Sequence, residues 1–588
     1  MKKNKYKVAI LPNNLEILVD ENTSLKEIFT ENGVNFEFPC GGMGVCKQCK
    51  VKIIKKNGQE IERLACRYKV KEDLTVEIPV VEQKHEILAE GLERDVLLAP
   101  LIKKIYLEIP PPSLKDTRDD WNRIVGKKGI RTNLKVLQDL PEQIRKSDFK
   151  ATVVIEGDKV RAIESQDTSE KLLGMAFDIG TTTIAGYLIN LKTGEEITQV
   201  SSLNPQTKYG ADVISRISFA SKSGGLEKLH REIIDELNKL IENAVKKVDY
   251  KQSDVYVITI AGNTTMQHLF LKIQPKYLAL APYVPVTTEQ VIVDADELKI
   301  KINPAGKVFV FPNIAGFVGG DTVAAALTCE MDKTEKLKLL IDIGTNGEIV
   351  LGTKDRLLAC ATAAGPAFEG VQISCGMRGA SGAIDHVSMG EDYKYTVIGN
   401  AMPRGVAGSG LVDAVAELLK IGLVNKNGRI VKQKDIKDDL GKKHSNRIEK
   451  INGISSFVLA KNTATGQPVY INQKDIREFQ LAKGAISAGI EILVKEYGAK
   501  VDDIDEVFLA GAFGNYLNRE SACKVGLIPK ELEEKTKGIG NAAGVGAKLA
   551  LLSEKEYERA VMLSHKIQYI ELSAHPEFNS TFFTKLDF

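Results

Sequence analysis

The sequence feature that most restricts the fold of this chain is a short motif that occurs twice after residue 171. Each copy is an apolar stretch that ends in Asp-Ile-Gly-Thr, first at Asp178 and again at Asp342, and a second apolar stretch follows at once. This pattern predicts two buried strands joined by a tight turn in each copy. The repeat therefore predicts a duplicated α/β region with two lobes, at about residues 172–330 and 331–588.

The turn in each copy carries groups that suit a phosphate. Successive backbone N–H groups and hydroxyls in such a turn face an anion, and an Asp at the strand end can hold a magnesium ion through water. We therefore expect Asp178 and Asp342 to be the catalytic carboxylates. The residues expected at the phosphates are Gly180, Thr181, Thr182 and Thr183 in the first turn and Gly344, Thr345, Asn346, Gly347 and Glu348 in the second.

Two further glycine loops each follow a predicted strand, one strand at Val255–Ile260 and one at residues 507–510. Glycine lets a nucleotide lie against the backbone, and the N-terminus of the helix that follows faces phosphate or ribose. The nucleotide contacts expected from these loops are Asn263, Thr264, Gly511, Gly514 and Asn515.

Other candidates in this region have an equally simple structural explanation. Gly408, Ser409 and Gly410 open a helical run and either touch nucleotide or form an ordinary cap. Gln480 and Lys483 lie on a predicted helix and face either the nucleotide or solvent, and we expect Lys483 to contact the nucleotide. In the same way, Asp321 is either an outer-shell group for magnesium or an N-cap.

Taken together, the ordered motifs resemble those of the superfamily that contains actin, sugar kinases, acetate kinase and the seventy-kilodalton heat-shock ATPases. The resemblance implies two ribonuclease-H-like lobes that close on ATP and Mg²⁺. It implies that Asp178 to Thr183 form the first phosphate loop, Asp342 to Glu348 the second, and Gly511 to Asn515 the adenosine loop.

The N-terminal 66 residues hold four closely spaced cysteines in the pattern Cys40-x5-Cys46-x2-Cys49-x16-Cys66, whereas Cys329, Cys360, Cys375 and Cys523 occur singly. With no His in this segment, the spacing indicates four thiolates around one inorganic centre. A disulfide pair is disfavoured because nothing indicates secretion. Zinc stays as the alternative, although closed zinc sites usually pair their ligands as two short clips. We expect a [2Fe–2S] cluster, and we expect the four single cysteines to be core thiols.

The segments around these cysteines resemble a ferredoxin domain of β-grasp type over about residues 1–83. Short apolar strands flank a helix that begins at Ser24, and Val51–Ile54 and Leu74–Ile78 alternate as strands after the cysteine loop. The x5 spacing is similar to the adrenodoxin-like class rather than to the plant-type x4.

Between this domain and the duplicated region we expect a linker over residues 84–105 and a small mixed middle domain over residues 106–171. A helix near Asn133–Ile144 and a hairpin turned at Gly157-Asp158 are the elements expected in the middle domain. The predicted fold class is therefore multidomain, with an α+β N-terminal part and an α/β C-terminal part.

Composition excludes several classes of protein. The formal net charge of +2 disfavours binding of nucleic acid or of a membrane surface through bulk charge. No run of about 18 apolar residues occurs, and no apolar segment follows the basic N-terminus, so we expect neither a membrane span nor a signal peptide. The scattered free cysteines suit a reducing cytoplasm.

The whole layout resembles the reductive activators of corrinoid-dependent methyltransferase systems, called RACo, or RamA in methanogens. The runs that carry the resemblance are Asn204-Pro205-Gln206 with Gly210-Ala211-Asp212, Gly262-Asn263-Thr264-Thr265-Met266, and Asp342 to Glu348. It implies that the chain takes one electron from a cellular donor and uses ATP to reduce a Co(II) corrinoid on a partner protein to Co(I). A homodimer is left open.

This chain departs from the methanogen branch, because its last cysteine is Cys523 and it lacks a C-terminal cysteine-rich [4Fe–4S] extension. Two other functions also fit an electron carrier joined to an ATPase. One is an ATP-dependent activator of a radical dehydratase or a similar low-potential enzyme. The other is a redox-sensing kinase or chaperone-like ATPase whose cluster only senses.

Overall fold

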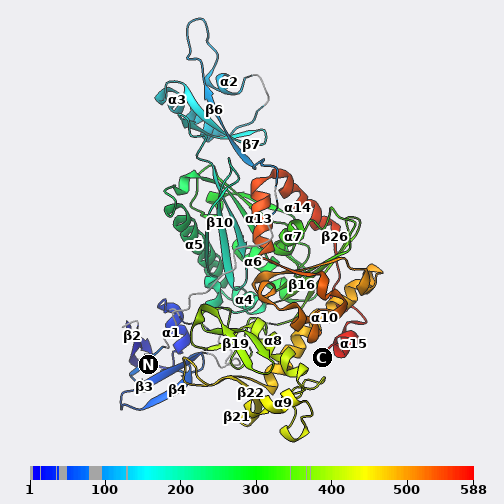
Figure 1. The fold of residues 1–588 in the computed structure, drawn as a ribbon. Helices are drawn as coiled ribbons and strands as arrows, with labels where there is room; N and C mark the ends of the chain where they lie inside the picture. Colours follow the sequence, from blue (N-terminus) through cyan, green and yellow to red (C-terminus); the bar gives the residue numbers. More distant parts are fainter. Residues whose placement is uncertain are drawn as a thin grey trace.

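An N-terminal β-domain, a small three-stranded domain and a large two-lobed region follow one another along the chain (Figure 1). The structure is a computed structural model. It describes residues 4–12, 15–34, 36, 38, 49–78, 94, 96–126, 130–344, 346–365, 367–370 and 372–588, apart from the side chains of residues 512, 513 and 515.

The N-terminal domain is a mixed five-stranded sheet in the order β2-β1-β5-β3-β4, packed on one helix. Its strands are β1 (Lys5–Leu11), β2 (Leu15–Asp20), β3 (Lys50–Lys55), β4 (Glu60–Leu64) and β5 (Leu74–Glu77). Helix α1 (Leu25–Glu31) begins at a capping box in which the Ser24 hydroxyl accepts from the Glu27 N–H and the Glu27 carboxylate accepts from the Ser24 N–H. Alternate residues of β1 and β3 and one face of α1 form a separate core.

The small domain is an antiparallel sheet in the order β6-β7-β8 with two helices. Its elements are β6 (Ile102–Glu108), α2 (Asp120–Val125), α3 (Leu134–Lys146), β7 (Lys150–Glu156) and β8 (Lys159–Ser165). The expected hairpin is confirmed, with its turn at residues 157–158. Strand β6 begins inside the stretch expected to be a linker, because Ile102 is fully buried against the first lobe.

The chain ahead of β6 is also anchored. Arg94 forms ion pairs with Glu330 and Glu556, and the Ala99 N–H donates to the carbonyl of Leu552. These contacts attach the described end of the expected linker to the two-lobed region.

The first lobe is a six-stranded sheet in the order β11-β10-β9-β12-β14-β13. Its strands are β9 (Leu173–Ile179), β10 (Thr183–Asn190), β11 (Glu196–Leu203), β12 (Val255–Gly262), β13 (Val291–Asp294) and β14 (Lys307–Val310). Its helices are α4 (Val213–Ala220), α5 (Gly225–Lys246), α6 (Thr264–Phe270) and α7 (Gly320–Thr328).

The second lobe contains a six-stranded sheet in the order β25-β24-β15-β16-β17-β26 and two small sheets. The main strands are β15 (Lys338–Ile343), β16 (Gly347–Gly352), β17 (Leu357–Thr362), β24 (Glu506–Ala510), β25 (Thr536–Gly540) and β26 (Ile567–Tyr569). The small sheets are β18 (Ala383–Met389), β19 (Tyr393–Val397) and β20 (Gly405–Val406), and β21 (Ile448–Ile451), β22 (Ile454–Ala460) and β23 (Val469–Asn472). The helices are α8 (Gly408–Lys420), α9 (Asp439–His444), α10 (Gln473–Tyr497), α11 (Gly511–Tyr516), α12 (Arg519–Lys524), α13 (Ala542–Leu552), α14 (Glu554–Lys566) and α15 (Phe578–Thr584).

The sheet topology confirms the duplication. The order β11-β10-β9-β12-β14 in the first lobe matches β17-β16-β15-β24-β25 in the second. In both lobes the first three strands pair antiparallel, and the last three pair parallel. Each Asp-Ile-Gly-Thr turn therefore occupies the same place in its sheet, at the hairpin between the central strand and its antiparallel neighbour.

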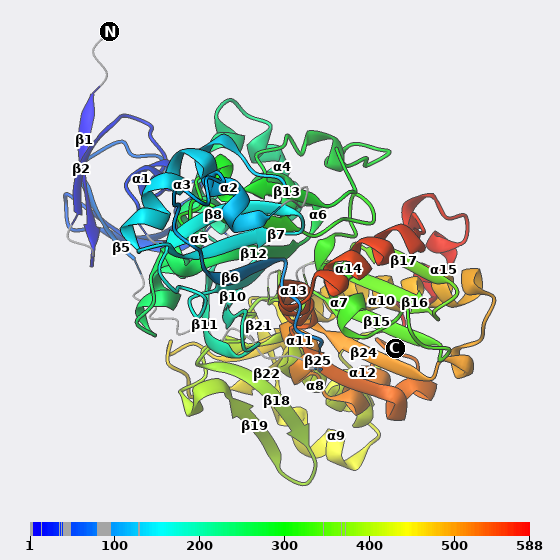
Figure 2. The same cartoon turned by 90° about the horizontal axis from the view of Figure 1, so that it is seen from above.

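Helices α7 and α13 pack against each other between the two main sheets, as the two views show (Figures 1 and 2). The contact is close because a Cβ placed on Gly546 would lie 2.2 Å from the Ala324 carbonyl oxygen. The Thr328 hydroxyl donates to the Ala542 carbonyl at 2.8 Å, and the Thr259 hydroxyl on β12 donates to the Ala547 carbonyl at 2.9 Å. Helix α13 thus belongs to the second half of the sequence but completes the core of the first lobe.

Candidate nucleotide site and cysteine site

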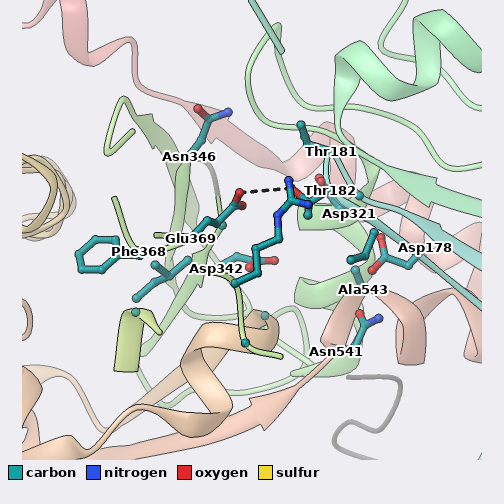
Figure 3. A pocket seen from close by; sticks show the side chains of 18 of the residues that line it. Asp178, Thr181, Thr182, Asp321, Asp342, Asn346, Phe368, Glu369, Asn541 and Ala543 are labelled. Carbon is teal, nitrogen blue, oxygen red and sulfur yellow. Dashed lines mark hydrogen bonds between the residues drawn. The ribbon is translucent and has the colours of Figure 1, made fainter. Parts of the chain in front are cut away.

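A cavity of about 280 Å³ lies where the two Asp-Ile-Gly-Thr turns face each other (Figure 3). It also receives the N-terminal ends of α7, α8 and α13, whose partial positive charge favours an anion. Of the residues predicted from the sequence, it is lined by Asp178, Gly180, Thr181, Thr182, Thr183, Asn263, Asp342, Gly344, Asn346, Glu348, Gly408, Ser409 and Gly511. The fold thus brings both predicted phosphate loops and the start of the predicted adenosine loop to one cavity.

The first phosphate loop is a tight turn held by its neighbours. The Gly180 N–H donates to the Thr183 carbonyl at 2.9 Å, which closes the turn. The Asn263 side-chain amide donates to the Thr181 hydroxyl at 3.0 Å, and its oxygen caps α6 by accepting from the Met266 N–H. Asn263 therefore joins the first phosphate loop to the start of the following helix.

Five carboxylates line the cavity, and in four of them, which are half-buried, loss of solvent raises the pKa. The pKa of Asp178 is raised to about 7 by burial and then by the charges of Asp321 and Asp342. Burial and the charge of Asp321 likewise raise the pKa of Asp342 to about 7. Burial raises the pKa of Asp321 to about 6, and burial with the neighbouring Asp321 and Asp342 raises that of Glu348.

This donor set fits a magnesium ion. Mg²⁺ prefers oxygen ligands and commonly binds through one or two carboxylates, several waters and substrate phosphates. Carboxylates that raise one another's pKa are stabilised in the ionised form by a cation between them. Asp321, which was predicted to be either an outer-shell group for magnesium or an N-cap, lines the cavity at the start of α7.

Several cavity residues were not found from the sequence, among them Glu369, Arg378, Tyr516 and Asn541. Glu369 points toward Thr182 across the cavity, and its carboxylate accepts from the Thr182 hydroxyl at 3.2 Å (Figure 3). This hydrogen bond joins the two lobes. Asn541 caps α13 through the Gly544 N–H and is a hydrogen-bond partner that lowers the pKa of Asp178 against the effect of burial.

Other predicted residues lie behind the cavity or away from it. The Thr264 hydroxyl donates to the Ala315 carbonyl at 2.7 Å. Gly347, Gly410 and Gly514 serve close packing, because a Cβ on each would approach Thr362, Ile384 or Leu509. Thr345 lies outside the described residues, as does the side chain of Asn515.

Lys483 and Gln480 do not line the cavity, which differs from the expectation for Lys483. Both side chains are buried and donate to backbone carbonyls near residue 588, Lys483 to Asp587 and Gln480 to Leu586 at 2.8 Å. Helix α10 turns this face toward the C-terminal segment rather than toward the nucleotide loops.

The cysteine site is described for two of its four predicted ligands. The sulfur atoms of Cys49 and Cys66 lie 3.2 Å apart, within hydrogen-bonding distance, and no disulfide joins these two described residues. Two sulfurs on one tetrahedral metal lie about 3.8 Å apart when each metal–sulfur bond is about 2.3 Å, whereas a disulfide bond is about 2.05 Å long. The observed 3.2 Å lies between these two values, so the two sulfurs are adjacent without being bonded to each other. Cys40 and Cys46 lie outside the described residues.

The remaining thiols do not gather into a second centre in the described part of the chain. Cys329, Cys360 and Cys523 are buried in the cores of the lobes, and burial raises the pKa of each thiol. Cys375 is only partly buried. Among the described residues, no helix is both long and apolar enough to span a bilayer.

Models of known families match the chain almost from end to end. Residues 8–71 match the 2Fe-2S iron-sulfur cluster binding domain, and residues 91–170 match the RACo linker region. Residues 173–334 match the RACo middle region, and residues 336–588 match the C-terminal domain of RACo, the ASKHA domain.

Full-length relatives agree with these matches. The corrinoid activation enzyme RamQ of Eubacterium limosum is 35% identical over 575 residues, which are 96% of each chain. The [Co(II) methylated amine-specific corrinoid protein] reductase of Methanosarcina barkeri is 25% identical over 455 residues, covering 71% of this chain and 77% of that protein. A solved structure of a reductive activator for corrinoid, iron-sulfur protein matches with a TM-score of 0.75 and 34% identity, over 99% of this chain and 98% of the other.

Proposed function

Because this chain belongs to the RACo family, we propose that it is an ATP-hydrolysing reductive activator that reduces the Co(II) corrinoid of a partner protein to Co(I). A [2Fe–2S] cluster held by Cys40, Cys46, Cys49 and Cys66 supplies the electron. A cellular reductant reloads it, and the protein works in the cytoplasm, as a homodimer.

The observation that carries this proposal is the presence of two sites in one chain. The sulfur atoms of Cys49 and Cys66 lie side by side in the N-terminal domain, and the cavity between the lobes brings together the loops and carboxylates expected of a magnesium–nucleotide site. An electron carrier joined to a nucleotide cavity supports coupling between the two.

The coupling has a physical reason. Ferredoxin-type [2Fe–2S] centres lie near −400 mV, and moving an electron to an acceptor about 100–200 mV lower costs roughly 2–5 kcal/mol. ATP can offset that cost only if it favours one conformation of the donor–acceptor complex. Two lobes that meet at the nucleotide provide such a conformational change.

We assign the roles of the cavity residues as follows. Asp178 and Asp342 would hold Mg²⁺, with Asp321 and Glu348 beside them in the same cavity. Thr181 to Thr183 and Gly344 to Asn346 hold the phosphates, and Gly511 lies at the adenosine. When bound, Mg²⁺ neutralises the phosphate charge that develops during hydrolysis. The domain limits 1–83, 84–105, 106–171 and 172–588 are part of this proposal.

The test is the ATP-dependent loss of the Co(II) absorption bands of a candidate corrinoid protein in the presence of a reductant. Cys49→Ser should abolish Co(I) formation but keep Mg·ATP binding, because it removes one cluster ligand and Cys49 is not among the residues that line the cavity. Asp342→Asn should leave the cluster spectrum intact but abolish ATP-dependent reduction.

Cys375→Ser is the matched control, since Cys375 is a thiol outside both sites, and it should keep full activity. Full ATP-dependent reduction by a Cys49→Ser protein that lacks the cluster would refute the proposal. An electron delivered to a radical dehydratase, or phosphorylation of a substrate without electron transfer, would favour one of the other two functions. Analytical ultracentrifugation of the same protein tests the homodimer.

A further inference from the structure

Three consecutive carbonyls of the first phosphate loop accept hydrogen bonds from one segment, residues 204–216. The Asn204 side-chain amide donates to the Gly180 carbonyl at 2.8 Å, and the Asn204 N–H donates to the Thr182 carbonyl at 2.9 Å. The Arg216 guanidinium donates to the carbonyl between them, that of Thr181. Asn204 and Arg216 are both fully buried.

The direction of these carbonyls determines where the loop N–H groups point. A peptide group is planar and trans, so the N–H that follows a carbonyl points away from it. With the carbonyls of Gly180, Thr181 and Thr182 held on the buried side, the N–H groups after them turn toward the cavity that these threonines line. Successive N–H groups that point to one side form an anion-binding concavity.

Arg216 is unusual for a buried cation, because no carboxylate among the described residues is hydrogen-bonded to its guanidinium. Its other hydrogen bonds go to the Gly210 carbonyl at 2.9 Å, to Gln206 Oε1 at 3.3 Å and to Met266 Sδ at 3.2 Å. A buried charge whose hydrogen bonds all go to neutral groups is costly. A polyphosphate on the far side of the loop would offset that cost.

The charges that face Arg216 come from both lobes. Burial lowers its pKa to about 9, Asp212 and Glu369 act to raise it, and Arg378 acts to lower it. The guanidinium therefore keeps its proton at neutral pH. Asp212 is engaged elsewhere, because its carboxylate caps α4 by accepting from the N–H and the hydroxyl of Ser215.

We infer that Asn204 and Arg216 are positioning residues for the nucleotide polyphosphate: they hold the carbonyls of the first phosphate loop away from the cavity, and Arg216 adds a buried positive charge behind that loop. This inference rests on the proposed nucleotide site. It gives a physical role to the run Asn204-Pro205-Gln206 and the helix that follows it.

The test compares Mg·ATP with adenosine, which has no phosphate, by isothermal titration calorimetry on the full chain. Arg216→Met removes the charge and the hydrogen bonds while keeping an apolar side chain of similar length. It should weaken Mg·ATP binding about 10- to 100-fold and leave adenosine binding unchanged. Arg216→Lys keeps the charge but has one nitrogen in place of the three of arginine, and it should lose less Mg·ATP affinity than Arg216→Met.

Asn204→Asp is the second variant. The carboxylate can still accept from the Gln206 N–H, as Asn204 Oδ1 does at 3.0 Å, but it cannot donate to the Gly180 carbonyl. It should also weaken Mg·ATP selectively. Arg123→Met is the control, because Arg123 is a buried arginine that pairs with Asp116 in the small domain, and its loss should not change Mg·ATP affinity.

Two results would overturn the inference. One is wild-type Mg·ATP affinity in folded Arg216→Met, and the other is an equal loss of adenosine and Mg·ATP affinity, which would indicate a general structural role. If circular dichroism shows that Arg216→Met does not fold, the same two outcomes are judged on Asn204→Asp: its affinity for Mg·ATP and its affinity for adenosine. A wild-type protein that binds no Mg·ATP would instead refute the proposed function, and this inference with it.

Discussion

The side chains that line the nucleotide cavity carry an excess of negative charge. Its carboxylates are those of Asp178, Asp321, Asp342, Glu348 and Glu369, and among its described lining residues Arg378 is the one cationic side chain. An ATP molecule carries several negative charges of its own. The cavity therefore requires a divalent cation to accept it.

Removal of Mg²⁺ should weaken ATP binding about 100- to 1000-fold, since one unscreened pair of like charges about 4 Å apart costs about 4 kcal/mol at an effective dielectric constant of 20. Calorimetry with and without EDTA measures the change. Adenosine is the control, because its binding involves no phosphate and should not depend on Mg²⁺. ATP affinity that is the same in EDTA would contradict this account of the cavity.

His386 on β18 and Asp413 on α8 form a hydrogen-bonded pair. Their Nδ1 and Oδ2 atoms lie 2.9 Å apart, and this hydrogen bond is the main reason that the pKa of His386 is raised, with the charges of Asp413 and Asp385 adding to it and burial opposing it. A raised histidine pKa stabilises the fold fully below its unfolded value of about 6.5, and the gain is lost as pH rises through the folded value.

We therefore expect His386→Gln to destabilise the protein more at pH 6 than at pH 8.5. Urea unfolding of the wild type and of His386→Gln, each at pH 6 and at pH 8.5, gives the comparison. An equal difference in midpoint at both pH values would mean that the pair contributes nothing through ionisation.

At the scale of elements, the strands were predictable and the loops between them were not. Apolar runs with turn signals located β9, β12, β15 and β24, because a buried strand leaves a local pattern. Glu369 and Arg378 lie in an irregular stretch between β17 and β18, and only the tertiary fold brings them to the cavity. Lys483 was assigned to the nucleotide because periodicity marks helix α10 but does not say which neighbour each of its faces meets.

The α7–α13 contact makes a prediction about one glycine. Ala normally stabilises a helix by about 1 kcal/mol relative to Gly. Gly546→Ala should do the opposite and lower the free energy of unfolding by about 1–3 kcal/mol, because its Cβ would lie 2.2 Å from the Ala324 carbonyl oxygen.

Thermal or urea unfolding measures this effect. Gly390→Ala is the matched control, since a Cβ there would have no atom within 4 Å, and it should leave stability nearly unchanged. A Gly546→Ala protein as stable as the wild type would show that the two helices can separate without cost.

At the scale of the whole molecule, the order of the domains and their fold classes were predictable because each domain carries its own motif. Comparison with known proteins confirms the ferredoxin domain and the actin-like lobes. The attachment of the small domain was not predictable. It depends on single contacts, such as the ion pair of Arg161 with Asp294 and the hydrogen bond of Tyr256 with Glu164, which leave no pattern in the sequence.

The N-terminal domain should work as a separate unit. It has its own core, and the ion pairs of Lys7, Lys50, Lys52 and Lys55 stay within it. A fragment of residues 1–83 should therefore bind a [2Fe–2S] cluster with the absorption and electron paramagnetic resonance spectra of the full chain. A fragment of residues 94–588 should bind Mg·ATP but reduce no Co(II).

The position of α13 also bears on how the protein is made. Strands β9 and β12 leave the ribosome long before the helix that covers them, so the apolar face shared with α7 stays exposed while most of the second lobe is synthesised. Exposed apolar surface on a growing chain is prone to aggregate. The first lobe therefore reaches its native core only after residue 552 has emerged, and until then this apolar face of the nascent chain is open to aggregation.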